Sequence, residues 1–223
     1  MEESKMEFSG VGSMKDGKID GVGTFQGGKY DTLRIDGVVT IEGDIEAESL
    51  KINGVCTCNG NLTAKVFDCD GVLTVKGNLR AGDVNIDGLV TVEGSKVEAD
   101  RIDCDGVLSV EGEISADIID ADGKLNAEEI VGDHITIRSY HRAVFRGLFI
   151  QIGGKIGDKF IKRFREKFSV IGLIEGTTVE LRGVHAKSVS GNNVNIGKGC
   201  EINSVSATGT LNIHPKAKVA VVL

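Results

Sequence analysis

The sequence predicts an all-β protein built as a parallel β-helix with coils of about 17 residues, together with a short basic helical insert. Three observations lead to this fold class. A unit of nine residues, IDGVVTIEG at 35–43, returns as INGVCTCNG, CDGVLTVKG, IDGLVTVEG and CDGVLSVEG, and a weaker copy, IDGVGTFQG, precedes it. The copies follow one another at a spacing of 16 to 18 residues. The apolar content is mainly valine and isoleucine, accompanied by many threonines and no tryptophan, and this composition favours strands.

Each coil contains three pairs of apolar residues. The two members of a pair are two positions apart, so both side chains lie on one face of a strand. Consecutive pairs are five or six positions apart, which indicates three short strands that turn around a common axis with the pairs pointing inward. One coil buries only about four full-sized aliphatic side chains, at roughly 1.5–3 kcal/mol each, so several stacked coils are needed for a stable fold. In one coil the pairs are Leu33/Ile35, Val39/Ile41 and Ile45/Ala47.

Charge and period divide the chain into four parts. Residues 1–137 hold 28 acidic and 12 basic residues, a balance of −16, whereas residues 138–168 hold 2 and 9, a balance of +7. After this basic block, NIGKGCEI and NIHPKAKV align at an offset of 17 residues and indicate further coils. We therefore predict an N-terminal arm over 1–17, a β-helix of about seven coils over 18–137, a basic amphipathic insert over 138–172, and a C-terminal β-helix module of about three coils over 173–223.

An aspartate or asparagine precedes the first glycine of every copy. The column admits two interpretations, a ladder of carboxylates that binds cations or a repeated turn. Asp and Asn bond their own backbone in turns, and Gly supplies a positive φ. Calcium-binding β-rolls repeat every nine residues, so the turn is the favoured interpretation. The column consists of Asp20, Asp36, Asn53, Asp70, Asp87, Asp105 and Asp122.

No residue pattern in the chain predicts catalysis. Cys56 and Cys58 occupy inward columns, as do Cys69 and Cys104, and buried cysteine packs as a small hydrophobe. Cys200 aligns with Ala217 of the last coil. The four histidines have no zinc-ligand spacing, and no nucleophile–base or phosphate-loop motif is present. We expect no catalytic, metal-binding or cofactor-binding residues and no cofactor.

The basic segment contains a pattern typical of an amphipathic helix. Phe160, Phe164 and Phe168 are four positions apart, and Ile161 lies beside them. Such a helix can lie on an anionic membrane surface, dock on the β-helix through its phenylalanines, or become ordered on a protein partner. The charged side chains of this predicted helix include Lys159, Lys162, Arg163 and Lys167.

Two further surfaces are predicted from the columns. The ends of a β-helix carry unpaired strand edges, and no obvious cap precedes Ile19, so the ends are expected to bind another copy. The residues expected in this polymerisation interface are Ile19, Val22, Phe25, Leu211, Ile213, Val219 and Val221. Separately, an outward apolar column predicts a lateral contact surface. We name it the lateral stripe; it comprises Val38, Val55, Val72, Leu89 and Val107, with Val22 at its N-terminal end.

The repeated units of the type CDGVLTVKG, together with the opening GGKYDTLRIDG, resemble the bactofilins, the bacterial polymer-forming cytoskeletal proteins. The NIGKGCEI unit and the HPKAKV tail are similar to those of the larger members found in Firmicutes. The resemblance implies a right-handed β-helix that polymerises end to end into nonpolar filaments without nucleotide. It also implies a role in cell shape, envelope organisation or motility.

Three function classes follow, and they differ in their partners. The first is a filament-forming scaffold whose partner is itself. The second is a non-polymerising binding module that docks on an anionic membrane or on an envelope or motility protein, and the third is a β-helix enzyme. The acidic balance argues against nucleic acid as a partner, and no small-molecule substrate is expected. The first ten residues lack the apolar core of a signal peptide and the cysteine number is odd, so we expect a cytoplasmic protein, peripheral at the inner face of the membrane if the basic helix binds lipid.

Overall fold

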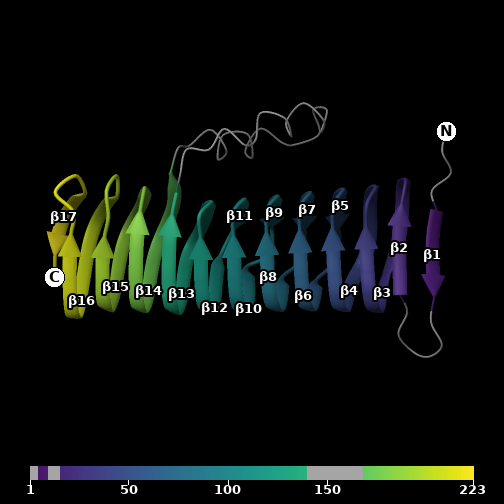
Figure 1. Cartoon of the computed structure of the whole chain (residues 1–223), viewed down its shortest axis with the longest axis horizontal. Helices are drawn as coiled ribbons and strands as arrows, with labels where there is room; N and C mark the ends of the chain where they lie inside the picture. Colours follow the sequence, from purple (N-terminus) through teal and green to yellow (C-terminus); the bar gives the residue numbers. More distant parts are fainter. Residues whose placement is uncertain (1–4, 10–15, 140–167) are drawn as a thin grey trace.

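The computed structural model describes residues 5–9, 16–139 and 168–223, and these form a β-solenoid of about 10 turns (Figure 1). The strands stack in order along one long axis, so the two ends of the rod are the two ends of the chain. All pairings between coils are parallel, which confirms the predicted parallel β-helix. No helix occurs in the part of the chain that the structure describes.

The strands form a single 17-stranded sheet. The long strands turn a corner and contribute to two or three faces of the solenoid, whereas the four-residue strands lie on one face. The bounds are β1 Lys5–Ser9, β2 Asp16–Asp20, β3 Val22–Ile35, β4 Val38–Ile52, β5 Val55–Cys58, β6 Leu62–Cys69, β7 Val72–Val75, β8 Leu79–Ile86, β9 Leu89–Val92, β10 Lys96–Cys104, β11 Val107–Val110, β12 Glu113–Ala121, β13 Lys124–Arg138, β14 Ser169–Arg182, β15 Val184–Ile196, β16 Glu201–Ile213 and β17 Lys218–Val222.

The coil has three faces, and the register between coils follows the predicted columns. Face A contains the rung Leu33–Ile35, face B the rung Val38–Ile41 and face C the rung Ile45–Ala47. On face B, Val39, Cys56 and Leu73 pair from one coil to the next and are buried. The inward pairs of all three faces form one continuous core, as the column assignment predicts.

The two predicted β-helix modules are continuous with each other. Strand β13 pairs with β14 from Asn126↔Val170 to Arg138↔Arg182, in the same register as the other coils. The partners in this pair are 44 positions apart, whereas Val170 and its next partner His185 are only 15 apart. The sheet therefore continues directly from β13 to β14, although 30 residues separate these two strands in the sequence.

The predicted basic helix falls mainly on residues 159–167, outside the described residues. Its last member, Phe168, is described and does not lie on a helix. It directly precedes β14, and its ring stacks on that of His185 at a centroid distance of 4.2 Å. The helical prediction is therefore wrong for Phe168, because this residue belongs to the start of a coil.

Candidate functional site

The two ends of the solenoid are not built alike. At the N-terminal end, β1 pairs antiparallel with β2, from Lys5↔Asp20 to Ser9↔Asp16, and covers the outer edge of face A. Beneath this edge, Tyr30 occupies the column that Ala47 and Ala64 fill in later coils, and its ring is buried. The larger side chain closes the end of the core, where no described strand precedes β3 on face C.

This partial cap bears on two of the residues expected in the polymerisation interface. Ile19 lies on β2 and is fully buried, so it is not available at the end surface. Val22 is 66% exposed, but it points sideways because its neighbour in the next coil, Val38, is an outward residue of the lateral stripe. Phe25 does lie at the end of the core, half-buried, with Ile41 stacked on one side. Over Val22–Gln26 on face B, β3 pairs with β4 but with no preceding strand among the described residues.

The C-terminal end has no comparable cover in the described residues. Strand β17 pairs with β16 over Glu201–Val205 and leaves its own outer edge unpaired. Leu211 and Val219 are half-buried in inward columns, and Val221 points outward. Val222, which belongs to the apolar tail Ala220–Leu223 expected at this end, pairs with the buried Val205 and so continues a core column. The apolar side chains at this end that are 39–77% exposed are Ile213, Val221, Val222 and Leu223.

The Asp–Gly column forms a corner of the solenoid, as the turn interpretation predicts. However, most of its glycines are required for a reason other than a positive φ. Only Gly21 of this column has a positive φ, and no described non-glycine residue has one. At the other positions a Cβ would meet the carbonyl oxygen of the glycine one coil earlier, for example at 2.0 Å for Gly88 and Gly71. Glycine is therefore required because successive coils approach closely at this corner.

Several carboxylates of this column are held by hydrogen bonds or ion pairs. Asp36 accepts hydrogen bonds from Arg34 Nε at 2.8 and 2.9 Å and from Asn53 Nδ2 at 2.7 Å. The Arg34 hydrogen bond, together with those from Asn53 and the positive charges nearby, lowers the pKa of Asp36. Arg138 bonds Asp122 at the far end of the same column. Within the described residues, no group of three or more His, Cys, Asp or Glu side chains is placed to hold a metal ion.

All five cysteines are buried and free, and they fill core columns as predicted. Burial raises the pKa of Cys69 to about 12 and raises those of Cys56 and Cys104 further. A nucleophilic cysteine needs a lowered pKa and access to solvent. These thiols therefore have a structural role.

The solvent exposure of the lateral stripe decreases along the rod from the N-terminal end. Val22 and Val38 are exposed, Val55 is half-buried, and Val72, Leu89 and Val107 are buried in a small cluster separate from the main core. All belong to one outward column, because their chain neighbours on face B fill the core.

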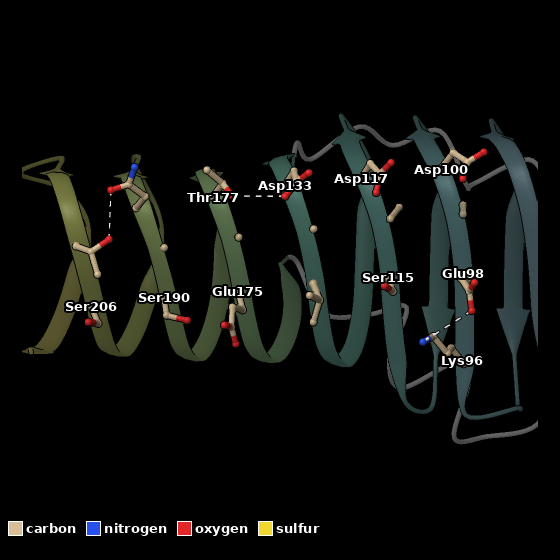
Figure 2. A pocket seen from close by; sticks show the side chains of 18 residues that line it. Lys96, Glu98, Asp100, Ser115, Asp117, Asp133, Glu175, Thr177, Ser190 and Ser206 are labelled. Atoms are coloured by element: carbon tan, nitrogen blue, oxygen red, sulfur yellow. Dashed lines mark hydrogen bonds and ion pairs between the residues drawn. The ribbon is translucent and has the colours of Figure 1, made fainter.

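A groove that the sequence did not predict runs along face C and its corner with face A (Figure 2). Asp100, Asp117 and Asp133 form one row along it, and Glu98, Ser115 and Glu175 belong to a second row. The groove exists because small residues recur at the corner, as in Gly132, where a Cβ would lie 2.3 Å from the Ala116 carbonyl oxygen. The repeated Ala-Asp and Gly-Asp steps were the available signal.

This groove has few features of an active site. The residues that line it include no cysteine, histidine or aromatic side chain, so it lacks a Ser–His or Cys–His pair. Its row of aspartates is exposed to solvent.

Comparisons with family models, curated proteins and solved structures found no match to this chain. No helix in the described part of the chain is long and apolar enough to cross a membrane.

Proposed function

We propose that this chain is a structural scaffold that assembles through the ends of its solenoid into nucleotide-independent filaments. One observation carries the proposal: in the described structure the outer edge of β17 has no partner strand, and apolar side chains beside it that continue core columns are exposed. A strand edge of this kind is a template for pairing with another chain unless it is protected.

The size of the contact sets the expected affinity. Four aliphatic side chains, each about half exposed, gain about 4 kcal/mol in total on burial, taking half of roughly 1.5–3 kcal/mol for each. New backbone hydrogen bonds along β17 add about 0.5–1.5 kcal/mol each. Association costs roughly 4–15 kcal/mol. The balance gives weak contacts between single ends, so assembly should require a concentration threshold.

The wider biological role rests on the resemblance to bactofilins. It supports a right-handed coil, nonpolar filaments in a bacterial cytoplasm, and a role in cell shape, envelope organisation or motility. The competing proposal is a monomeric binding module whose basic segment docks on an anionic membrane or a protein partner. That proposal gains support from the charge of the segment alone.

The test is negative-stain microscopy and light scattering of the purified full chain across a concentration series. We expect filaments for the wild type and a large loss of assembly for Val222→Asp and for Phe25→Asp. The matched control is Val66→Asp, because Val66 is an exposed residue in the middle of the rod and Asp83 already occupies the next rung of its column. Monomers at every concentration, or equal assembly of all four proteins, would contradict the proposal.

A further inference from the structure

One coil of the solenoid contains two Asn–Gly steps, Asn53–Gly54 and Asn59–Gly60. An asparagine that precedes glycine is prone to lose ammonia spontaneously, because the glycine nitrogen has no neighbouring Cβ to hinder its attack on the asparagine side chain. The reaction needs a backbone nitrogen that is free to lose its proton and a side chain that is free to turn toward it. The fold provides these conditions at one step and withholds them at the other.

The first step, Asn53–Gly54, is held at both reacting groups. It belongs to the Asp–Gly corner, where the Gly54 N–H donates to the Ile35 carbonyl of the preceding coil at 3.2 Å. The Asn53 side chain is half-buried, and its Nδ2 donates to Asp36 Oδ1 at 2.7 Å. The nitrogen that would attack is therefore engaged, and the side chain that would be attacked is fixed.

The second step, Asn59–Gly60, lies at another corner and is held at neither group. The Asn59 side chain is exposed, and its Nδ2 donates to Glu42 Oε1 at 2.9 Å in an exposed hydrogen bond. Among the described residues, the Gly60 N–H has no hydrogen-bond acceptor. Solvent can therefore reach the side chain, and no hydrogen bond has to break before the nitrogen reacts.

The free amide of Gly60 reflects a local departure from the repeat. One coil later, the Gly77 N–H donates to the Gly60 carbonyl at 3.0 Å. The corresponding acceptor for Gly60 would be the Gly43 carbonyl, but Gly43 has a φ of 93°. That carbonyl accepts the Cys58 thiol instead, at a distance of 3.6 Å between sulfur and oxygen. The conformation of Gly43 thus leaves Gly60 without the hydrogen bond that Gly77 makes.

We propose that Asn59 is a site of spontaneous covalent modification, at which the side-chain amide is lost as ammonia. The Gly60 nitrogen loses its proton and attacks Asn59 Cγ; the amide nitrogen leaves as ammonia, and a cyclic imide forms. Water then opens the imide at Cγ to give aspartate, or at the main-chain carbonyl to give isoaspartate, whose main chain runs through Cβ. Water is the only co-reactant. The proposal goes beyond the end-to-end assembly described above and does not depend on it.

Both products disturb the corner at which they form. The Asn59 amide donates a hydrogen bond to Glu42, whereas a carboxylate at this position repels it as a like charge. Isoaspartate also lengthens the main chain beside Gly60, which stacks so closely that a Cβ on it would lie 2.4 Å from the Gly43 carbonyl carbon. The coil should therefore open locally more often after modification than before it.

Incubation of the folded full chain at mildly alkaline pH, followed by trypsin digestion and tandem mass spectrometry, tests the proposal. Trypsin releases residues 52–65 as one peptide, so the two asparagines are compared within the same molecule. We expect Asn59 to be modified about tenfold faster than Asn53 or more, since the bonded Gly54 amide reacts only when its corner opens. In denaturant the two steps should react at similar rates.

Two matched variants separate the sites by a second measurement, methyl transfer to isoaspartate by an isoaspartyl methyltransferase. After incubation, Asn59→Ser should accept far less methyl group than the wild type, whereas Asn53→Ser should accept as much as the wild type. Equal modification of Asn53 and Asn59 in the folded protein would overturn the proposal. An Asn59 that stays intact in the folded protein while both asparagines react in denaturant would overturn it as well.

Discussion

Replacing Gly88 by alanine tests the stacking of coils at the Asp–Gly corner most directly. The new Cβ would lie 2.0 Å from the carbonyl oxygen of Gly71 in the preceding coil, and contacts below 3.0 Å essentially do not occur. The two coils must therefore separate by about 1 Å at this point. Because φ of Gly88 is not positive, backbone strain within the residue contributes nothing to the effect.

The separation acts on hydrogen bonds that hold the corner. Leu89 N donates to the Gly71 carbonyl at 2.8 Å, and Gly88 N donates to the Cys69 carbonyl at 2.9 Å. An increase of about 1 Å takes both beyond hydrogen-bonding distance. Gly71, Gly88 and Leu89 are buried, and each unsatisfied buried group costs about 1–3 kcal/mol, so we expect Gly88→Ala to lower the free energy of unfolding by about 3–5 kcal/mol.

Urea unfolding followed by circular dichroism measures this difference. The control is Gly28→Ala, where φ is also not positive and a Cβ would find its nearest neighbour, the Tyr30 hydroxyl, at 3.7 Å. This substitution should change the free energy of unfolding by less than about 1 kcal/mol, and in the stabilising direction if the unfolded chain loses entropy. Similar unfolding curves for the two variants would refute the explanation of the corner by close stacking.

Three other outcomes follow from the described contacts. Ser169→Ala removes the hydroxyl that accepts the hydrogen bond from the buried Leu125 N–H, and urea unfolding should show a loss of about 1–3 kcal/mol; an unchanged midpoint would contradict this. Asp36→Asn should destabilise the protein at pH 7 but have less effect in acid. The pKa of Asp36 is lowered chiefly by Arg34, so its contribution is present above the unfolded value near 3.8 and is lost as the pH falls through the lower folded value; a difference that does not depend on pH would exclude this role. The five thiols, with the pKa of Cys69 at about 12, should resist a thiol reagent in the native state and all react in denaturant; rapid modification of the folded protein would show that the columns are wrong.

The repeated part of the fold was accessible to sequence reasoning because each coil repeats the same requirement. Side chains such as Val39 and Cys56 must fill one column, and a period of two within strands determines which residues point inward. The register observed between coils follows directly. The corner glycines show the limit of this reasoning. A glycine in a turn suggests a positive φ, whereas the reason found at Gly88 is a contact with another coil, which a local pattern does not contain.

The departures from the repeat were harder to predict. Asn126 pairs directly with Val170, although the two residues are 44 positions apart in the sequence. The sequence between them does not follow the 17-residue period, so the period does not predict that the two strands pair in register. The cap at the N-terminal end depends on Tyr30 in a column of alanines and on an antiparallel strand at Lys5–Ser9. Neither feature belongs to the parallel repeat, so the columns gave no signal for them.

These departures are also where specific function is expected to reside. Every interior coil pairs with its two neighbours in nearly the same register and with similar apolar side chains. An interior residue such as Val90 would therefore pack equally well on many coils and cannot select one particular binding partner. The ends differ, since one carries Tyr30 and a covering strand whereas the other exposes Val222 and Leu223. If the open C-terminal ends associate first, a variant with Val222→Asp should remain monomeric, whereas Phe25→Asp should stop at dimers. Sedimentation velocity distinguishes these two states, and dimers of Val222→Asp would mean that the capped end binds first.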